Sequence, residues 1–455
     1  MSDNFHLVPD SWAWSRVDQA GFVQLGRQRS PQHHSGDHMR PYLRVANVYE
    51  NRIDTRDVME MNFTPAEAER FSLSFGDILL NEGQSRELVG RPAMFHGEVS
   101  GACFQNTLIR FKAQTFVDPR YALSLFRYYF HAGNFQNVCK WTTNIAHLGA
   151  ERFASMPFPL APLPEQKRIA DKLDALLARV DACRGRLDRV PAILKRFRQS
   201  VLAAATSGEL TREWREARGM EMKWPTVALD EVCDSIADGD HQAPPKADQG
   251  VPFITIGAIN TGVLRLDEAT RFVPESYFTS LKPERRAQLG DVLFSVTGSL
   301  GIPALVETTT PFVFQRHIAV LRPNPTRVSA KFLFHQLSAD DIQRQAMEVA
   351  TGTAQLTIPL RGLRAFTLAL PSIAEQHEVV RRVESLFSLA STLERRSDLA
   401  RARTERLTPS LLAKAFRGEL VPQDPSDEPA SVLLARLKGA EPVGAKKRKG
   451  KGAKA

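Results

Sequence analysis

No group of residues in this sequence combines the residue types and the spacing of a catalytic or metal centre. The densest cluster of possible metal ligands, residues 33–38 (HHSGDH), lacks the helical or zinc-finger spacing that would gather its side chains around one ion. The four cysteines, Cys103, Cys139, Cys183 and Cys233, lie far apart. We find no G-x-x-x-x-G-K-S/T phosphate loop and no glycine-rich cofactor fingerprint. We therefore expect no metal, no catalytic residue and no enzymatic activity in this chain alone.

The composition is typical of a globular protein with two to four domains. The chain has 455 residues, of which 43% are hydrophobic and 24% are charged. It contains no apolar run near the roughly 20 residues of a membrane helix, and it does not open with a secretory signal pattern. The last ten residues (KKRKGKGAKA) hold six of the nine net positive charges. We expect a cytoplasmic protein whose body is nearly balanced in charge, with a basic, disordered tail.

The two halves of the chain share landmark residues at a constant offset of 210 positions. The landmarks are Trp14 and Trp224, Phe104-Gln105 and Phe314-Gln315, Glu165-Gln166 and Glu375-Gln376, and Gly208-Glu209-Leu210 and Gly418-Glu419-Leu420. A period of 210 residues is too long for a solenoid. The pattern predicts a duplicated unit, with copies at about 1–210 and 211–420.

Each predicted copy opens with a mixed region that contains short β-rich runs separated by Gly, Pro and Asp. The runs lie at residues 42–48, 77–80 and 107–111 in the first copy and at 252–256, 291–297 and 317–321 in the second. Residues 120–131 form the clearest helical pattern, with an aromatic stripe that we interpret as a face packed into the core. These regions predict two compact α+β domains.

Each predicted copy closes with a long helix that carries a heptad pattern. In the first copy one row of apolar residues is spaced by seven and a second row runs beside it, whereas the corresponding rows of the second copy contain more polar and small residues. The first-copy rows are Leu173, Val180, Leu187, Leu194 and Val201, and Leu176, Cys183, Val190, Phe197 and Ala204. We expect the two helices to pair in antiparallel fashion. Pro191 and Pro409 should kink or break them, and Gly208 and Gly418 should follow their ends.

These motifs resemble the DNA-specificity subunits of type I restriction-modification systems. That family opens its helices with a Leu-Pro-x-x-x-Glu-Gln motif, which residues 370–376 (LPSIAEQ) match. Residues 160–166 (LAPLPEQ) match with Ala161 in place of the proline. The helix ends at 205–210 and 415–420 and the extension after Val421 are also similar, so the resemblance covers about residues 10–437.

The resemblance implies an α+β protein with two target-recognition domains, residues 1–160 and 211–370. A pair of long antiparallel coiled-coil helices, residues 161–210 and 371–420, separates them with pseudo-two-fold symmetry, and residues 421–455 form a C-terminal extension and the basic tail. Each recognition domain would read one half of a bipartite, asymmetric site in double-stranded DNA. The helices would set the spacer between the half-sites.

The resemblance also implies the partners and where the chemistry lies. The helices would dock methyltransferase subunits, two of them, and through these the restriction and translocase subunits. The residues that mark the partner-binding helices are Glu165, Gln166, Leu173, Leu187, Glu375, Gln376, Leu386 and Leu393. S-adenosylmethionine, ATP and Mg would belong to the partner subunits, and this chain would hold no cofactor.

Reading a base sequence requires donors and acceptors for base edges, and cations for phosphates. The candidates are polar residues on predicted loops and strand ends, namely Arg40, Arg44, Asn47, Gln84, Ser85 and Arg86 in the first domain and Lys246, Asn260, Thr297, Ser299 and Arg316 in the second. The loop Gln84-Ser85-Arg86 is the strongest candidate, and Thr297-Gly298-Ser299 is its counterpart. Gln105 and Gln315 recur in both halves and are interpreted as structural.

Two other functions fit the same sequence pattern. One is a standalone DNA-binding regulator, and the other is a coiled-coil scaffold that binds only proteins. Neighbouring methyltransferase and helicase-nuclease genes, or methyltransferase subunits purified with the chain, would favour the specificity subunit.

Overall fold

The computed structural model describes residues 8–142, 145–240, 243–353 and 355–439. The chain divides into two compact units: unit 1 comprises residues 1–186 and 400–455, and unit 2 comprises residues 187–399. In the part of the chain that is described, no helix combines the length and the apolar character needed to cross a membrane.

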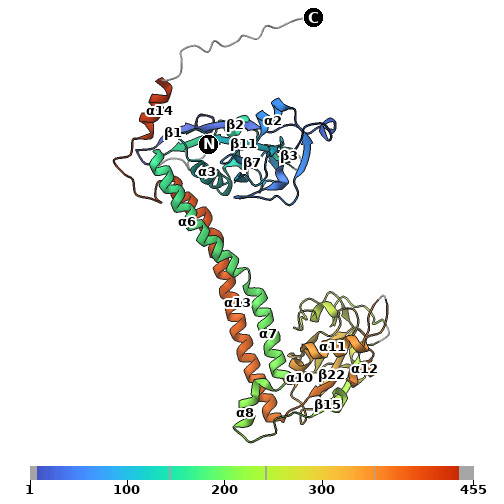
Figure 1. Ribbon diagram of the computed structural model, residues 1–455. Helices are drawn as coiled ribbons and strands as arrows, with labels where there is room; N and C mark the ends of the chain where they lie inside the picture. The colour runs from blue at the N-terminus through green and yellow to red at the C-terminus, as the bar shows by residue number, and fades with distance from the viewer. Residues whose placement is uncertain (1–7, 143–144, 241–242, 354, 440–455) are drawn as a thin grey trace. The chain divides into compact units, whose positions relative to one another are not determined.

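Unit 1 contains a four-stranded antiparallel sheet and a smaller three-stranded sheet (Figure 1). The larger sheet has the order β2 (Gly21–Leu25), β11 (Leu108–Ala113), β7 (Ile78–Asn81) and β9 (Pro92–Met94). The smaller sheet has the order β10 (Cys103–Phe104), β3 (Met39–Leu43) and β6 (Met59–Asn62), in which β10 and β3 are parallel. The pair β1 (Ala13–Arg16) and β14 (Pro157–Leu160) joins the start of the domain to its end.

The two main sheets of unit 2 have the same strand order and pairing as those of unit 1. Its larger sheet has the order β16 (Cys233–Asp238), β22 (Ile318–Pro323), β19 (Val292–Ser295) and β20 (Pro303–Leu305). Its smaller sheet has the order β18 (Phe272–Val273), β17 (Val251–Ile254) and β21 (Val313–Phe314), in which β17 and β21 are parallel. The pair β15 (Thr226–Ala228) and β23 (Thr367–Ala369) corresponds to β1 and β14.

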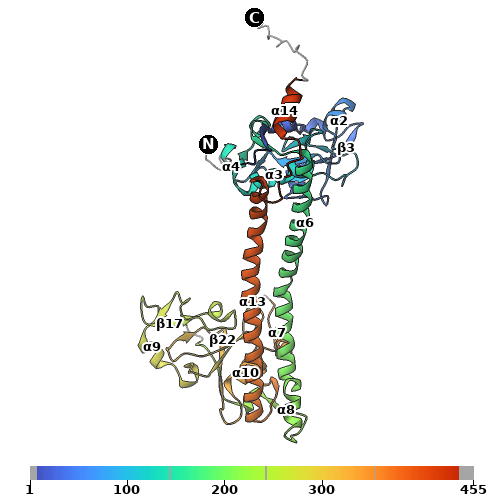
Figure 2. The same ribbon diagram turned by 90° about the vertical axis from the view of Figure 1, so that its left-hand side faces the viewer.

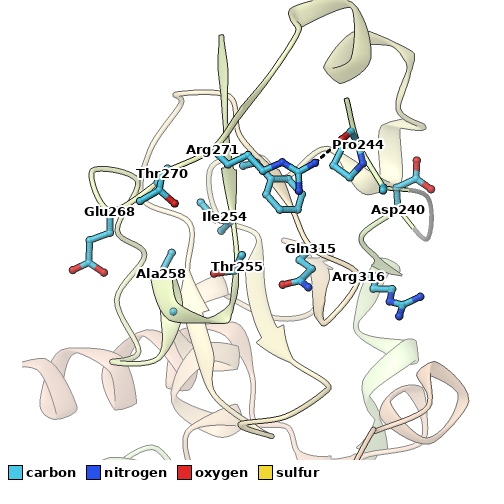
Figure 3. A pocket seen from close by; sticks show the side chains of 14 residues that line it. Asp240, Pro244, Ile254, Thr255, Ala258, Glu268, Thr270, Arg271, Gln315 and Arg316 are labelled. Atoms are coloured by element: carbon cyan, nitrogen blue, oxygen red, sulfur yellow. Dashed lines mark hydrogen bonds between the residues drawn. The ribbon is translucent and has the colours of Figure 1, made fainter. Parts of the chain in front are cut away.

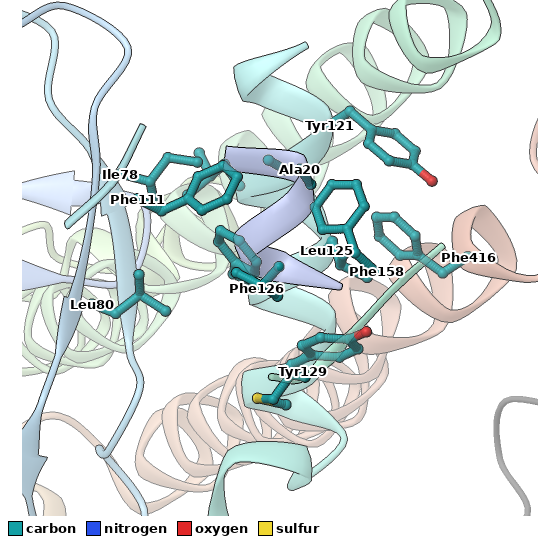
Figure 4. Packing of buried hydrophobic residues seen from close by; sticks show 14 of the residues in the cluster. Ala20, Ile78, Leu80, Phe111, Tyr121, Leu125, Phe126, Tyr129, Phe158 and Phe416 are labelled. Atoms are coloured by element: carbon teal, nitrogen blue, oxygen red, sulfur yellow. The ribbon is translucent and has the colours of Figure 1, made fainter. Parts of the chain in front are cut away.

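The core of unit 1 lies under helix α3 (Pro119–His131), where an aromatic face meets the larger sheet (Figure 4). Tyr121, Leu125 and Tyr129 are buried, as the aromatic stripe predicted. Tyr121 also packs against Phe416, with ring centroids 5.3 Å apart. Phe416 is the last residue of α13 (Ile373–Phe416), so the end of this long helix is part of the core of unit 1.

The Trp14–Trp224 landmark is wrong as a structural match. Trp12, and not Trp14, occupies the place of Trp224: Trp12 packs edge-on against Tyr121 and Trp224 against Phe332, in each case with ring centroids 6.2 Å apart. Trp14 is 42% exposed. The offset between the units is therefore 212 residues at this strand and 210 at the long helices, because loop lengths differ.

The long helices are α6 (Leu163–Leu187), α7 (Val190–Thr206) and α13. A short interruption at 188–189 separates α6 from α7, so Pro191 falls in the first turn of α7, where its missing N–H costs no hydrogen bond. Pro409, where a kink or break was predicted, does not break α13, which continues through it to Phe416. Gly208 and Gly418 follow the helix ends with φ of +83° and +73°, as expected.

Each end of α13 packs against one of the other long helices inside a single unit (Figure 2). In unit 1, Leu173 and Leu177 of α6 are buried in the cluster that contains Leu412. In unit 2, Val201 of α7 is buried in the cluster that contains Val383. Leu173 and Val201 of the first predicted heptad row thus lie in these clusters, whereas Cys183 in the second row is exposed.

His335 of α10 (Ala330–Leu337) is buried in unit 2, beside Phe387. Burial lowers the pKa of His335 to about 4 from an ordinary value of 6.5. Because the pKa is lowered, the neutral His335 side chain contributes fully to the stability of the fold above pH 6.5. This contribution is lost as the pH falls toward 4. We expect the wild-type protein to lose up to about 3 kcal/mol more unfolding free energy over this range than His335→Phe, measured by urea unfolding of unit 2. Equal losses in the two proteins would contradict this expectation.

Candidate nucleic-acid interface

The Glu-Gln pair at the start of α6 and of α13 anchors each helix to the domain that precedes it. The Gln166 side chain accepts a hydrogen bond from Asp118 N at 2.9 Å and donates to Ala161 O at 2.8 Å. The Gln376 side chain accepts from Ser329 N at 2.8 Å and donates to Pro371 O at 3.0 Å. Both side chains are fully buried, so these glutamines fix the orientation of helix and domain inside the chain.

Glu375 forms a buried cluster in unit 2. Its carboxylate pairs with Arg215 and accepts hydrogen bonds from Thr211 Oγ1 at 2.6 Å and Trp224 Nε1 at 3.2 Å. Ser372 Oγ accepts a hydrogen bond from Glu375 N near the start of α13, while the Glu375 carboxylate is held in this cluster.

Glu165 occupies the corresponding place in unit 1, but its partner is neutral. Gln423 Nε2 donates to Glu165 Oε1 at 2.7 Å, and burial raises the pKa of this carboxyl group. The side chains of Glu165, Gln166, Glu375 and Gln376 thus all lie inside the chain. Of the other residues that mark the helices, Leu173 is buried, Leu187 and Leu386 are half-buried and Leu393 is exposed.

The loop Gln84-Ser85-Arg86 follows β7 and borders a small three-stranded sheet. This sheet has the order β12 (Lys140–Trp141), β13 (Ala146–His147) and β8 (Gly83–Gln84). Arg86 is exposed, and its guanidinium carbon lies 5.7 Å from the centroid of the Trp141 ring. The loop therefore presents a cation and an aromatic ring to solvent.

The loop Thr297-Gly298-Ser299 has the corresponding place after β19 in unit 2. Thr297 bridges Thr357, which in turn bridges Thr351. Gly298 N donates to Leu356 O at 3.2 Å. Ser299 is exposed, whereas Thr297 is buried and its hydroxyl lies 3.3 Å from that of Thr357, so Thr297 supports the loop from inside.

A cavity of about 590 Å³ opens in unit 2 among residues that include Asp240, Ile254 and Thr270 (Figure 3). Gln315 and Arg316, on the turn between β21 and β22, form part of its wall. Arg271 reaches across it to donate to Pro244 O at 2.5 Å, and its guanidinium carbon lies 4.7 Å from the centroid of the Phe253 ring. The wall thus combines planar cations with an amide, the groups that recognise base edges and phosphates.

The acidic side of this cavity is held by hydrogen bonds. Tyr277 donates its hydroxyl to Asp240 Oδ2 at 2.9 Å, and Arg285 lies 3.4 Å from the same carboxylate. Burial, followed by the hydrogen bond to Asp240, raises the pKa of Tyr277 to about 12. Tyr277 therefore remains a neutral donor at physiological pH.

The corresponding surface of unit 1 corrects one site prediction. Asn47 is only 2% exposed, and its side-chain amide donates to Asp54 O and Asp57 O at 2.9 Å. The polar residue after β3 therefore stabilises the turn instead of facing a ligand. Arg44 is half-buried and pairs with Asp57, and Arg40 is exposed on β3.

The main chain around Gln105 and Gln315 is the same in both units. Gln105 N donates to Leu43 O at 2.9 Å, and Gln315 N donates to Ile254 O at 3.1 Å. A Cβ on Gly26 would lie 2.2 Å from Gln105 O, and one on Gly239 would lie 2.4 Å from Phe314 O, so only glycine allows these strands to approach so closely.

The other sequence candidates lie apart from these loops in the chain. Lys246 and Asn260 are exposed, the second just after the short helix η5 (Ile256–Ile259) that borders the cavity. In the described ranges, no group of three or more His, Cys, Asp and Glu side chains is placed to hold a metal ion.

Sequence reasoning missed Trp141, Arg271 and an aromatic-cation stack in unit 1. Tyr49 has two guanidinium groups over its ring, with the carbon of Arg52 at 4.8 Å and that of Arg91 at 4.6 Å. An isolated aromatic residue inside a polar stretch was the available signal for Trp141. The partners of Tyr49 and Arg271 are brought together by the fold.

Comparisons with known proteins all match this chain to specificity subunits of type I restriction enzymes. The family model described as "Type I restriction modification DNA specificity domain" matches residues 32–192 and 221–399. The specificity subunit of the type I restriction enzyme EcoBI from Escherichia coli is 33% identical over 339 residues, 69% of this chain and 71% of that protein. The EcoKI specificity subunit of E. coli K12 is 29% identical over 456 residues, 95% of this chain and 96% of that protein.

A solved structure has a similar fold. The HsdS subunit from Thermoanaerobacter tengcongensis superposes with a TM-score of 0.63 at 20% identity, over 90% of this chain and 98% of that chain. At this level of identity the likeness concerns the fold.

Proposed function

Because the chain belongs to the family of type I restriction modification DNA specificity domains, we propose that it is the DNA sequence-specificity subunit of such a system. In this role each unit reads one half of a split, asymmetric site in double-stranded DNA. The observation that carries the proposal is the family match to two segments that share one strand connectivity but differ in the side chains on their loops.

Equivalent positions of the two units share main-chain contacts but carry different side chains. The main-chain contacts of Gln105 and Gln315 are the same. The residue that bridges each glutamine differs, however: it is Arg27 in unit 1 and Asp240 in unit 2. Arg27 is buried in an ion pair with Glu67, while Asp240 borders the cavity. A common framework with different side chains is what two readers of different sequences require.

We propose that the two units arose by duplication and that the long helices form an antiparallel coiled coil that sets the spacer. The packing of α6 and of α7 against opposite ends of α13 supports this arrangement. Rigid helices hold a distance that flexible linkers would not. In the proposed complex the helices also dock two methyltransferase subunits, and the chain acts in the cytoplasm.

The catalytic chemistry in this proposal belongs to the partners. Methyltransferase subunits would supply S-adenosylmethionine-dependent adenine methylation, and restriction subunits would supply the ATP- and Mg-dependent steps. The chain itself would recognise DNA and position these subunits.

Lengthening both helical segments by matched whole turns should change the recognised spacer and leave both half-sites unchanged. Helical rise adds about 1.5 Å per residue, and two recognition elements must keep their phase along the duplex. The recognised motif of the lengthened variant can be determined from its methylation pattern. Retention of the original spacer would refute the role of the helices.

The function can be tested with the chain purified together with its methyltransferase subunits. We expect two copies of the methyltransferase subunit per chain, and binding to duplex DNA that weakens steeply with salt. Sequence-specific binding by the chain without these subunits would instead support a standalone regulator. Stable assembly without any DNA binding would support a protein scaffold.

A further inference from the structure

The small sheet β12–β13–β8 in unit 1 carries an exposed patch made of Arg86, Lys140, Trp141 and Ile145. Trp141 is 51% exposed and Ile145 is 45% exposed. Lys140 precedes Trp141 on β12 and is exposed, and Arg86 lies against the Trp141 ring. An exposed aromatic ring beside a cation has the chemistry of a nucleic-acid contact, because cations attract phosphates and an apolar side chain can contact base edges in the major groove.

The patch is held in place before any partner binds. Thr142 donates from both its N–H and its hydroxyl to Ile145 O, each at 3.0 Å. Lys140 on β12 lies opposite His147 on β13 in the antiparallel register, and the His147 ring is hydrogen-bonded to Glu82 at 3.1 Å. A preorganised surface loses less conformational entropy on binding.

Unit 2 presents different chemistry at the corresponding place. There Thr297 pairs with Thr357, and Thr357 with Thr351. Residues 351–357 (TGTAQLT) contain neither a charged nor an aromatic residue. The two units thus place different side chains on equivalent positions, which is expected where the halves of an asymmetric site are read.

We propose that Trp141 is a specificity-determining residue that contacts a base edge in the major groove of the half-site read by unit 1, with Lys140 and Arg86 at the flanking phosphates. The inference rests on the proposed function. The major groove admits a two-stranded ribbon, and β12 with β13 forms a hairpin at one edge of the small sheet, with Trp141 on its outer strand. A side chain at this edge can contact base edges in the groove while the bases remain paired. At the corresponding place unit 2 would present the uncharged hydroxyl and amide groups of residues 351–357 instead.

The test uses the assembled complex with methyltransferase subunits and a duplex that carries the full split site. Trp141→Ala should weaken binding about tenfold, the size of loss that one mismatched base pair causes. Substituting each base pair of the half-site read by unit 1 should reveal one position at which wild-type affinity falls and Trp141→Ala affinity does not. Lys140→Ala should reduce the slope of log K against log salt by about 1.

Phe75→Ala is the matched control. Phe75 is 76% exposed and lies just before the start of β7, whereas the patch follows the end of this strand. Replacing Phe75 should therefore leave DNA affinity unchanged. If the wild type reads a split site, two results would overturn the inference. One is unchanged affinity in Trp141→Ala, and the other is loss of the methyltransferase subunits from this variant during gel filtration. A wild-type complex without preference for any split site would overturn the proposed function itself.

Discussion

Replacing Glu375 by glutamine should destabilise unit 2 by about 3–5 kcal/mol, because it leaves the Arg215 guanidinium buried without its counter-ion. Both side chains are almost completely buried. The remaining acceptors of Arg215, Gly208 O at 2.7 Å and Thr211 Oγ1 at 3.2 Å, are neutral and cannot replace a carboxylate. Differential scanning calorimetry, with hydrogen exchange to assign the transition to unit 2, would measure the loss.

Glu165→Gln is the matched control in unit 1. Its partner Gln423 is neutral, and burial raises the pKa of Glu165, so the ionised form is less favourable in the folded protein at neutral pH. A glutamine there still accepts from Gln423, and we expect the stability of unit 1 to stay the same or rise. Equal losses in the two variants would contradict the difference that we assign to the two clusters.

Truncation after Leu420 should destabilise unit 1 by at least about 3 kcal/mol, because the C-terminal segment completes its core. Ala430 is fully buried, and its N–H donates to Ser11 O at 2.9 Å. Asp427 pairs with Arg168 at 2.7 Å, and Gln423 bonds both Glu165 and Ser11. Urea unfolding monitored by hydrogen exchange in unit 1 would measure the effect.

Truncation after Gly439 separates this segment from the basic tail. That variant keeps all the contacts of Gln423, Asp427 and Ala430 and removes only residues 440–455, so we expect the unfolding free energy of wild type. If the two truncations lowered stability equally, the contribution assigned to residues 421–439 would be wrong.

The sequence predicted the features that depend on local rules. Glycine at 208 and 418 predicted the helix ends, since a positive φ is easiest for glycine. Pro191 predicted an interruption near 190, although Pro409 did not interrupt α13. The aromatic stripe of residues 120–131 predicted a buried face, and the 210-residue offset found segments that occupy corresponding places in the two units.

The features that the sequence did not predict depend on contacts between distant residues. The Glu-Gln motifs stand out in the sequence, but Glu375 meets Arg215 and Trp224 only after folding. Asn47 has the residue type and position of a DNA-reading residue, yet its side-chain amide is turned inward and donates to Asp54 O and Asp57 O. The cation beside the Trp141 ring is Arg86, which comes from a turn elsewhere in the chain. Loops with such partners carry no periodic signal.

Comparison of methylomes from cells with and without this gene tests the central claim most directly. We predict that deletion abolishes methylation at one motif made of two specific half-sites separated by an unspecific spacer of fixed length, and that the intact gene restores it. Unchanged methylation at every split motif, in cells whose methyltransferase partner genes are intact and expressed, would contradict the assignment of this chain as the specificity subunit.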